Sequence, residues 1–152
     1  MAETAPLALI GVVPHITVDG AAAAIEFYVK AFGAEELGRH AAPDGRVMHA
    51  ALRINGGVLY LNDAFPEHGG NGSPNTIGET AVTLHLEVAD ANTAYDRAVA
   101  AGATATMPLD DMFWGARYGQ IKDPFGHRWS IASPTRQATE AEIEAGGKKH
   151  FG

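Results

Sequence analysis

The sequence predicts an α+β fold in which two paired βαβββ modules form a curved mixed sheet around a cleft, with the helices outside. Three observations lead to this prediction. An offset of 70 residues places His15 on His85, and the same strand-to-helix pattern follows both. Each expected helix then carries apolar side chains at helical spacing. Short strand-like segments separated by turn residues follow each helix.

The first strand of each module precedes its helix and ends at Val18 or Val88, which the offset superposes. The first helix is predicted from an i, i+3, i+4, i+7 stripe of Ile25, Tyr28, Val29 and Phe32, and its counterparts are Tyr95, Ala98, Val99 and Gly102. We expect Gly33 and Gly102 to end the two helices, because glycine favours the left-handed cap.

Three further strands are expected in each module. In the first module they span residues 35–40, 46–54 and 58–62, separated by turn residues at 43–45 and 55–57. In the second module they span residues 104–107, 118–122 and 127–132, separated by a long loop at 109–117 and a turn at 123–126. The repeat therefore predicts βαβββ twice.

We predict a single domain over residues 1–152. Module one covers about 7–64, a linker about 65–79, module two about 80–134 and a C-terminal tail 135–152. The linker contains glycine and proline without periodicity. In the tail, Thr139 and Glu142 match a capping box, which predicts a short solvated helix ending at Gly146 and Gly147.

Composition limits the classes of partner and of metal site that the protein can have. The chain has 152 residues, a formal charge of −7 and no cysteine. The acidic charge argues against a nucleic-acid or anionic-membrane partner, and the missing thiols exclude disulfides and thiolate metal sites. Residues 1–10 lack the basic region of a signal peptide. We therefore expect a cytoplasmic protein that does not span a membrane.

Strand alternation separates packing residues from candidate site residues. On one face of the second module's first strand we expect Val82, Leu84, Leu86 and Val88 to meet the helices, as Val12 and Val18 do in the first module. Likewise Met48, Ala50, Leu52 and Ile54 are expected on the helix side of their strand, opposite Val47. His15, His49 and His85 then share the other face, where they would line a pocket.

His15 and His85 are candidate catalytic acid–base groups, because imidazole titrates near neutral pH. Glu87, two residues from His85, could orient a histidine or act as a base. The competing interpretation is structural, with both histidines satisfied by neighbouring strands. Trp114, Arg117 and Tyr118 could wall a pocket and clamp an anion, or simply pack. If His15, His49 and His85 converge, they could bind zinc or iron.

Several stretches resemble PhnB-like proteins of the vicinal oxygen chelate superfamily, which includes glyoxalase I, extradiol dioxygenases, fosfomycin-resistance enzymes and bleomycin-binding proteins. The stretches are residues 22–38, 43–57 and 107–130, with FWGARYG followed by DPFGH as the most specific part. The resemblance covers roughly residues 12–133. It implies the paired βαβββ fold, a small-molecule ligand and a homodimer.

Metal-using members of that superfamily take ligands from the first and last strands of each module. The resemblance places those positions at Val13, Tyr60, Thr83 and Ser130. Valine cannot bind a metal, and neutral hydroxyls are poor ligands beside carboxylate and imidazole. We therefore expect no metal at these four positions and no other cofactor, with Tyr60 and Ser130, like His49, contacting the ligand instead.

The leading hypothesis is a PhnB-like protein that binds a small organic molecule between its modules without the glyoxalase-type metal. Whether it is an enzyme stays open. One alternative is a metal-dependent lyase or dioxygenase with a divalent metal on relocated ligands, His15, His49 and His85. Another is a drug-sequestering resistance protein of the bleomycin-binding kind.

Overall fold

A computed structural model describes residues 11–152. The elements are, in chain order, β1 (His15–Val18), α1 (Ala21–Phe32), β2 (Glu35–Ala41), β3 (Val47–Ile54), β4 (Gly57–Asp63), η1 (Pro66–His68), α2 (Pro74–Ile77), β5 (Thr83–Glu87), α3 (Ala91–Ala101), β6 (Thr104–Asp111), β7 (Ala116–Lys122), β8 (Arg128–Pro134) and α4 (Glu140–Phe151). The expected start of module one, residues 7–10, and the segment tested for a signal peptide lie outside the described residues. None of the helices within residues 11–152 is long and apolar enough to cross a bilayer.

The strands form two four-stranded mixed sheets with the same order, β1-β4-β3-β2 and β5-β8-β7-β6. The first strand of each pairs parallel with the last, and all other pairs are antiparallel. His15 lies opposite Tyr60 and His85 opposite Ser130, so the 70-residue repeat extends to the strand register. The α+β class and the paired βαβββ modules are confirmed.

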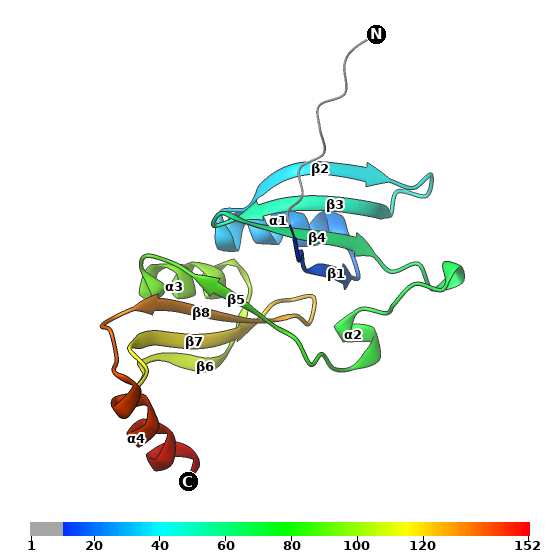
Figure 1. The fold of residues 1–152 in the computed structure, drawn as a ribbon. Coiled ribbons are helices and arrows are strands. Elements are labelled where there is room, and N and C mark those ends of the chain that lie inside the picture. Colours follow the sequence, from blue (N-terminus) through cyan, green and yellow to red (C-terminus); the bar gives the residue numbers. More distant parts are fainter. Residues whose placement is uncertain (1–10) are drawn as a thin grey trace.

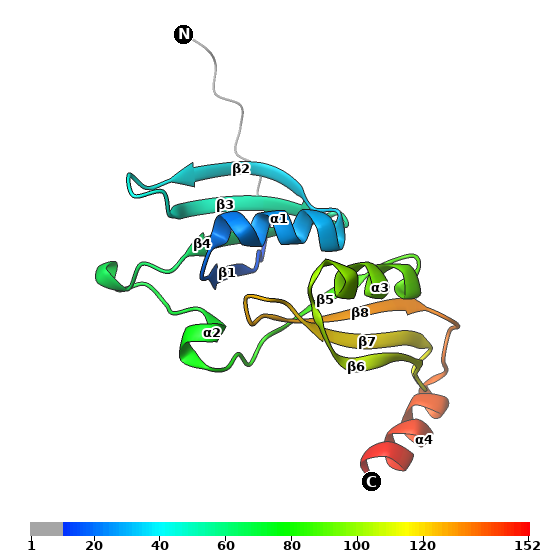
Figure 2. The same cartoon turned by 180° about the vertical axis from the view of Figure 1, so that it is seen from behind.

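The two sheets stay separate and do not close into one curved sheet around a cleft. Within the described residues, β1 pairs only with β4, and β5 only with β8. Helices α1 and α3 pack together on the same side of the two sheets, as Figure 2 shows, while Figure 1 shows the opposite side. The core lies between these helices and the sheets, with Tyr28, Leu52 and Ile131 fully buried.

A buried carboxylate in the turn between β7 and β8 ties the modules together. Asp123, only 3% exposed, accepts hydrogen bonds from Tyr28 Oη on α1 (2.6 Å) and Trp129 Nε1 on β8 (2.9 Å). Its other oxygen accepts from the backbone N–H groups of Phe125 and His127, both at 2.9 Å. The predicted turn at 123–126 is present, and it also docks module two onto α1.

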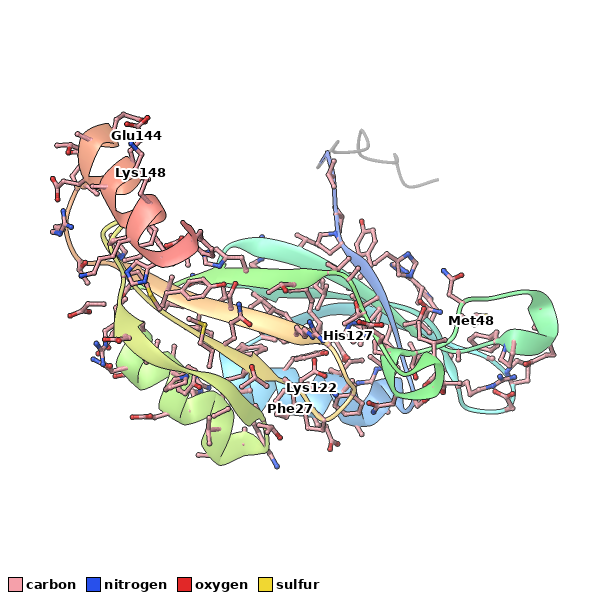
Figure 3. All side chains as sticks on the ribbon, turned by 90° about the horizontal axis from the view of Figure 1, so that it is seen from below. Phe27, Met48, Lys122, His127, Glu144 and Lys148 are labelled. Carbon is pink, nitrogen blue, oxygen red and sulfur yellow. The ribbon has the colours of Figure 1, made fainter. Side chains whose placement is uncertain are left out.

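Further polar contacts link the modules. His127 Nε2 lies 2.9 Å from the carbonyl oxygen of Thr17, and His127 lies where the modules meet in Figure 3. Arg97 Nε on α3 donates to the carbonyl oxygen of Lys30 at the end of α1 (2.7 Å). These bonds connect β1 and the C-terminal turn of α1 to module two, and the one to Lys30 satisfies a carbonyl group left free at a helix end.

The expected helix-side residues of β3 and of the first strands need correction. The pairing of β2 and β3 shifts between His49 and Val47, which is a β-bulge at Met48. The extra residue reverses the alternation, so Val47 is buried in the core and Met48 is exposed. Val12 and Val82, which precede β1 and β5, are exposed rather than packed against helices.

Three segments are more regular than the sequence predicted. The loop predicted at 109–117 is shorter, because β6 continues to Asp111 and β7 begins at Ala116. The linker contains η1 and α2, and Ser73 caps α2. The capping box at Thr139 is present, but α4 continues through Gly146 and Gly147 to Phe151.

Candidate functional site

Three side chains from three strands cluster on the helix-free face of the first sheet. The rings of His15 (β1) and His49 (β3) are 5.8 Å apart, and the Tyr60 ring (β4) lies 4.7 Å from His49 and 6.0 Å from His15. His40 on β2 lies opposite His49 in the strand register. Burial, followed by the nearby imidazoles of His15 and His40, lowers the pKa of His49.

On the second sheet His85 (β5) forms a hydrogen-bonded chain. His85 Nδ1 lies 2.6 Å from Ser130 Oγ on β8, and Nε2 lies 2.8 Å from Glu87 Oε1. An ionised carboxylate only accepts, so the neutral imidazole carries its proton on Nε2 and accepts from the Ser130 hydroxyl at Nδ1. Ser130 is buried, whereas the Glu87 side chain is 68% exposed.

Two aromatic rings wall the His85 group. The Tyr118 ring (β7) stacks on His85 at 6.1 Å and 19°, and Trp114 packs edge-on against Tyr118 at 5.6 Å. Gln120 Nε2 donates to Tyr118 Oη at 2.9 Å and thereby orients the phenol. Sequence reasoning did not single out Gln120, although its even spacing from Tyr118 places both on one face of the strand.

Arg117 does not join this group. It alternates to the helix side of β7, where its Nε donates to Asn92 Oδ1 on α3 (2.8 Å) and its Nη1 lies 3.2 Å from Asp111 Oδ1. Because Asp111 already pairs with the guanidinium, Arg117 is not oriented to bind an anion on the pocket side.

Two adjoining hollows follow the seam between the modules. One, of about 570 Å³, is lined by His15 and His127, and the other, of about 590 Å³, by His85 and Trp129. The walls that they share are Pro14, Val82 and Leu84. Their sizes lie in the range of small-molecule pockets, and their walls combine apolar side chains with a few polar ones.

The three pocket-face histidines do not converge as a metal site. His15 and His49 share the first sheet, and His85 belongs to the separate group on the second. Among residues 11–152 no three His, Asp or Glu side chains lie close enough to hold a metal ion.

The four positions implied by the superfamily do not fit a metal either. Val13, two residues before β1, and Thr83, the first residue of β5, carry neither an imidazole nor a carboxylate. Tyr60 packs against His49, and the Ser130 hydroxyl is engaged by His85. This donor set lacks the carboxylate and imidazole ligands that divalent transition metals prefer in proteins.

Comparison with known proteins relates this geometry to a family. Residues 9–131 match the glyoxalase/bleomycin resistance protein/dioxygenase superfamily. The uncharacterized protein Rv0887c of Mycobacterium tuberculosis is 52% identical over 134 residues, which are 87% of this chain and 79% of that protein.

Two solved structures share the fold. TioX from Micromonospora sp. ML1 has a TM-score of 0.63 and 25% identity, covering 85% of this chain and 99% of TioX. A PhnB protein from Bacillus cereus has a TM-score of 0.62 and 20% identity, covering 80% and 98%. The resemblance noted from the sequence is confirmed, and this chain belongs to the glyoxalase/bleomycin resistance protein/dioxygenase superfamily, also called the vicinal oxygen chelate superfamily.

Proposed function

We propose that the protein binds a small organic molecule in the seam between its modules, without the glyoxalase-type metal, and that His85 is the acid–base group of the site. The observation that carries this proposal is the Ser130–His85–Glu87 chain, in which both imidazole nitrogens are hydrogen-bonded beside a hollow of about 590 Å³. Such bonds fix the ring orientation and the tautomer, which acid–base chemistry requires.

The chemistry of the walls supports a ligand with an apolar body and one polar group. Val12 and Val82, both exposed, supply apolar surface in the hollow that His85 lines. A ligand that displaces the exposed Glu87 carboxylate would accept a hydrogen bond from His85 Nε2 in its place. Ser130, held at Nδ1, keeps the ring in position during this exchange.

The test is a fragment screen by NMR on protein treated with EDTA. We expect neutral apolar fragments that carry one hydrogen-bond acceptor to shift the Val82 and Leu84 methyl signals and the His85 imidazole signals. His85→Gln is expected to weaken their binding at least tenfold, and Arg117→Gln, which alters a residue outside the site, to leave it unchanged. The proposal fails if no fragment perturbs these residues or if His85→Gln binds as well as wild type.

We also propose that the protein forms a homodimer. In the described chain the outer edges of the two sheets, formed by β2 and β6, have no further strand partner, and Leu37 on β2 is 43% exposed. Unpaired strand edges beside apolar side chains favour pairing with another chain, and the repeat gives each copy two equivalent edges. Light scattering should give about twice 15.9 kDa, and a mass of 15.9 kDa at 100 μM or above would contradict the proposal.

A further inference from the structure

Helix α4 contains two interior glycines, although glycine is unfavourable inside a helix relative to alanine. The helix buries none of its residues, so packing in the core does not account for them. The two positions differ in their surroundings. A Cβ built on Gly146 would overlap the ring of Phe113, whereas a Cβ on Gly147 would meet open space. Gly146 therefore makes room for Phe113.

Phe113 belongs to the turn between β6 and β7, and two residues of α4 contact its ring. Its ring lies against the backbone of Gly146 and stacks on the ring of His150, one helical turn later, at 5.3 Å and 11°. Residues four apart lie on the same face of a helix. Figure 3 shows α4, marked by Glu144 and Lys148, at the opposite end of the molecule from Met48.

The backbone of this turn is also tied to the chain that leads into α4. Arg136 Nη1 pairs with Glu142 Oε2 on α4 at 2.6 Å, and its Nη2 donates to the carbonyl oxygen of Phe113 at 3.3 Å. The carbonyl oxygen of Gly115 accepts from the N–H of Thr135 at 2.8 Å. Both faces of the turn are thus held by residues 135–150.

The turn connects α4 to the His85 group through a series of ring contacts. Phe113 packs edge-on against Trp114 at 5.0 Å, Trp114 against Tyr118 at 5.6 Å, and Tyr118 stacks on His85 at 6.1 Å. Such contacts are directional. A displacement of Phe113 therefore moves Trp114 relative to Tyr118.

We propose that α4 is a clamp that holds the Phe113–Gly115 turn, and with it Trp114, as an outer wall of the His85 group, and that Gly146 is its positioning residue. The functional meaning of the wall rests on the ligand site proposed above. The clamp itself is a matter of packing, and the experiments below measure it without a ligand.

The test compares Gly146→Ala with Gly147→Ala in the full chain. Both changes remove an interior glycine, so helix propensity alone predicts that both raise Tm by about 2–4 °C. We expect this rise for Gly147→Ala only, and a lower Tm for Gly146→Ala, because its methyl group displaces Phe113. Equal rises for the two variants would overturn the clamp.

Iodide quenching of fluorescence follows the wall directly. Trp129 is 4% exposed and Trp114 is 37% exposed, so the quencher reports Trp114. We expect Gly146→Ala to increase quenching by about twofold as Trp114 leaves Tyr118, and Gly147→Ala to leave it unchanged. If Gly146→Ala does not increase quenching, the clamp is wrong.

If Gly146→Ala unfolds the wild-type protein, the same substitution can be measured in a Phe113→Ala variant. In Phe113→Ala the ring that occupies the space is gone, so Gly146→Ala should now raise Tm as much as Gly147→Ala does. A lower Tm in this background would overturn the assignment of Gly146 to Phe113.

The wall role has its own readout in the modification of His85 by diethyl pyrocarbonate, measured by peptide mass spectrometry. In Gly146→Ala we expect at least a twofold faster reaction of His85, with His68 in η1 as the unaffected control. If diethyl pyrocarbonate modifies His85 at an unchanged rate, Trp114 does not act as a wall of the His85 group, even if the quenching changes. A fragment screen without binders would overturn only the proposed ligand site, so the two failures are distinguishable.

Discussion

Replacement of Asp123 by asparagine should weaken the contact between the modules and lower the free energy of unfolding. The carboxylate accepts from Tyr28 and Trp129 with one oxygen and from two backbone N–H groups with the other. An amide supplies only one oxygen, so its NH₂ group must face two donors. With hydrogen bonds to a charged group contributing about 1.5–3 kcal/mol each, we expect a loss of about 3 kcal/mol in the free energy of unfolding.

Urea denaturation followed by circular dichroism measures this loss, and a thermal scan should show Tm lower by about 6–12 °C for a domain of this size. Asp96→Asn is the matched control, because Asp96 is an exposed carboxylate on α3, and it should change stability by less than about 0.5 kcal/mol. A loss below about 1 kcal/mol for Asp123→Asn would refute the idea that this carboxylate docks the modules.

Three further predictions concern single side chains. The pKa of His49 is lowered in the folded protein, so near and below pH 6.5 the unfolded chain binds more protons than the folded one. The free energy of unfolding therefore falls as the pH falls through this range. Urea denaturation of His49→Gln should show a weaker dependence on pH. Asp63 accepts from the N–H groups of Gly20, Ala21 and Val47, so Asp63→Ala should cost about 2–4 kcal/mol in the same assay. Nitrogen-15 spectra should show neutral His85 protonated on Nε2, and Glu87→Gln should reduce that preference.

The repeat made most of the fold predictable. Helix periodicity and the glycines at 33 and 102 locate α1 and α3, and both glycines occupy the helix ends as expected. The errors arise where tertiary contacts override local signals. The bulge at Met48 depends on its pairing with β2, and Gly146, which was expected to end the helix, lies inside α4 against a phenylalanine 33 residues earlier.

The candidate site was predictable only in part. Alternation placed His15, His49 and His85 on the side of the sheets without helices, but alternation carries no information on distance between sheets. The contact of His85 with Ser130 follows from the β5–β8 register, which a single sequence does not specify. The sequence indicates Asp123 only as a turn residue. Its contact with Tyr28 could not be predicted, because the two residues are 95 positions apart.

The most direct test of the central claim compares fragment binding to EDTA-treated protein with binding after addition of zinc, nickel, manganese or iron, with the imidazole signals of His85 as the readout. We expect the same affinities and the same shifts in all five samples, and loss of binding in His85→Gln. Tight stoichiometric uptake of one of these metals, with ligand binding or turnover that appears only in its presence, would contradict it.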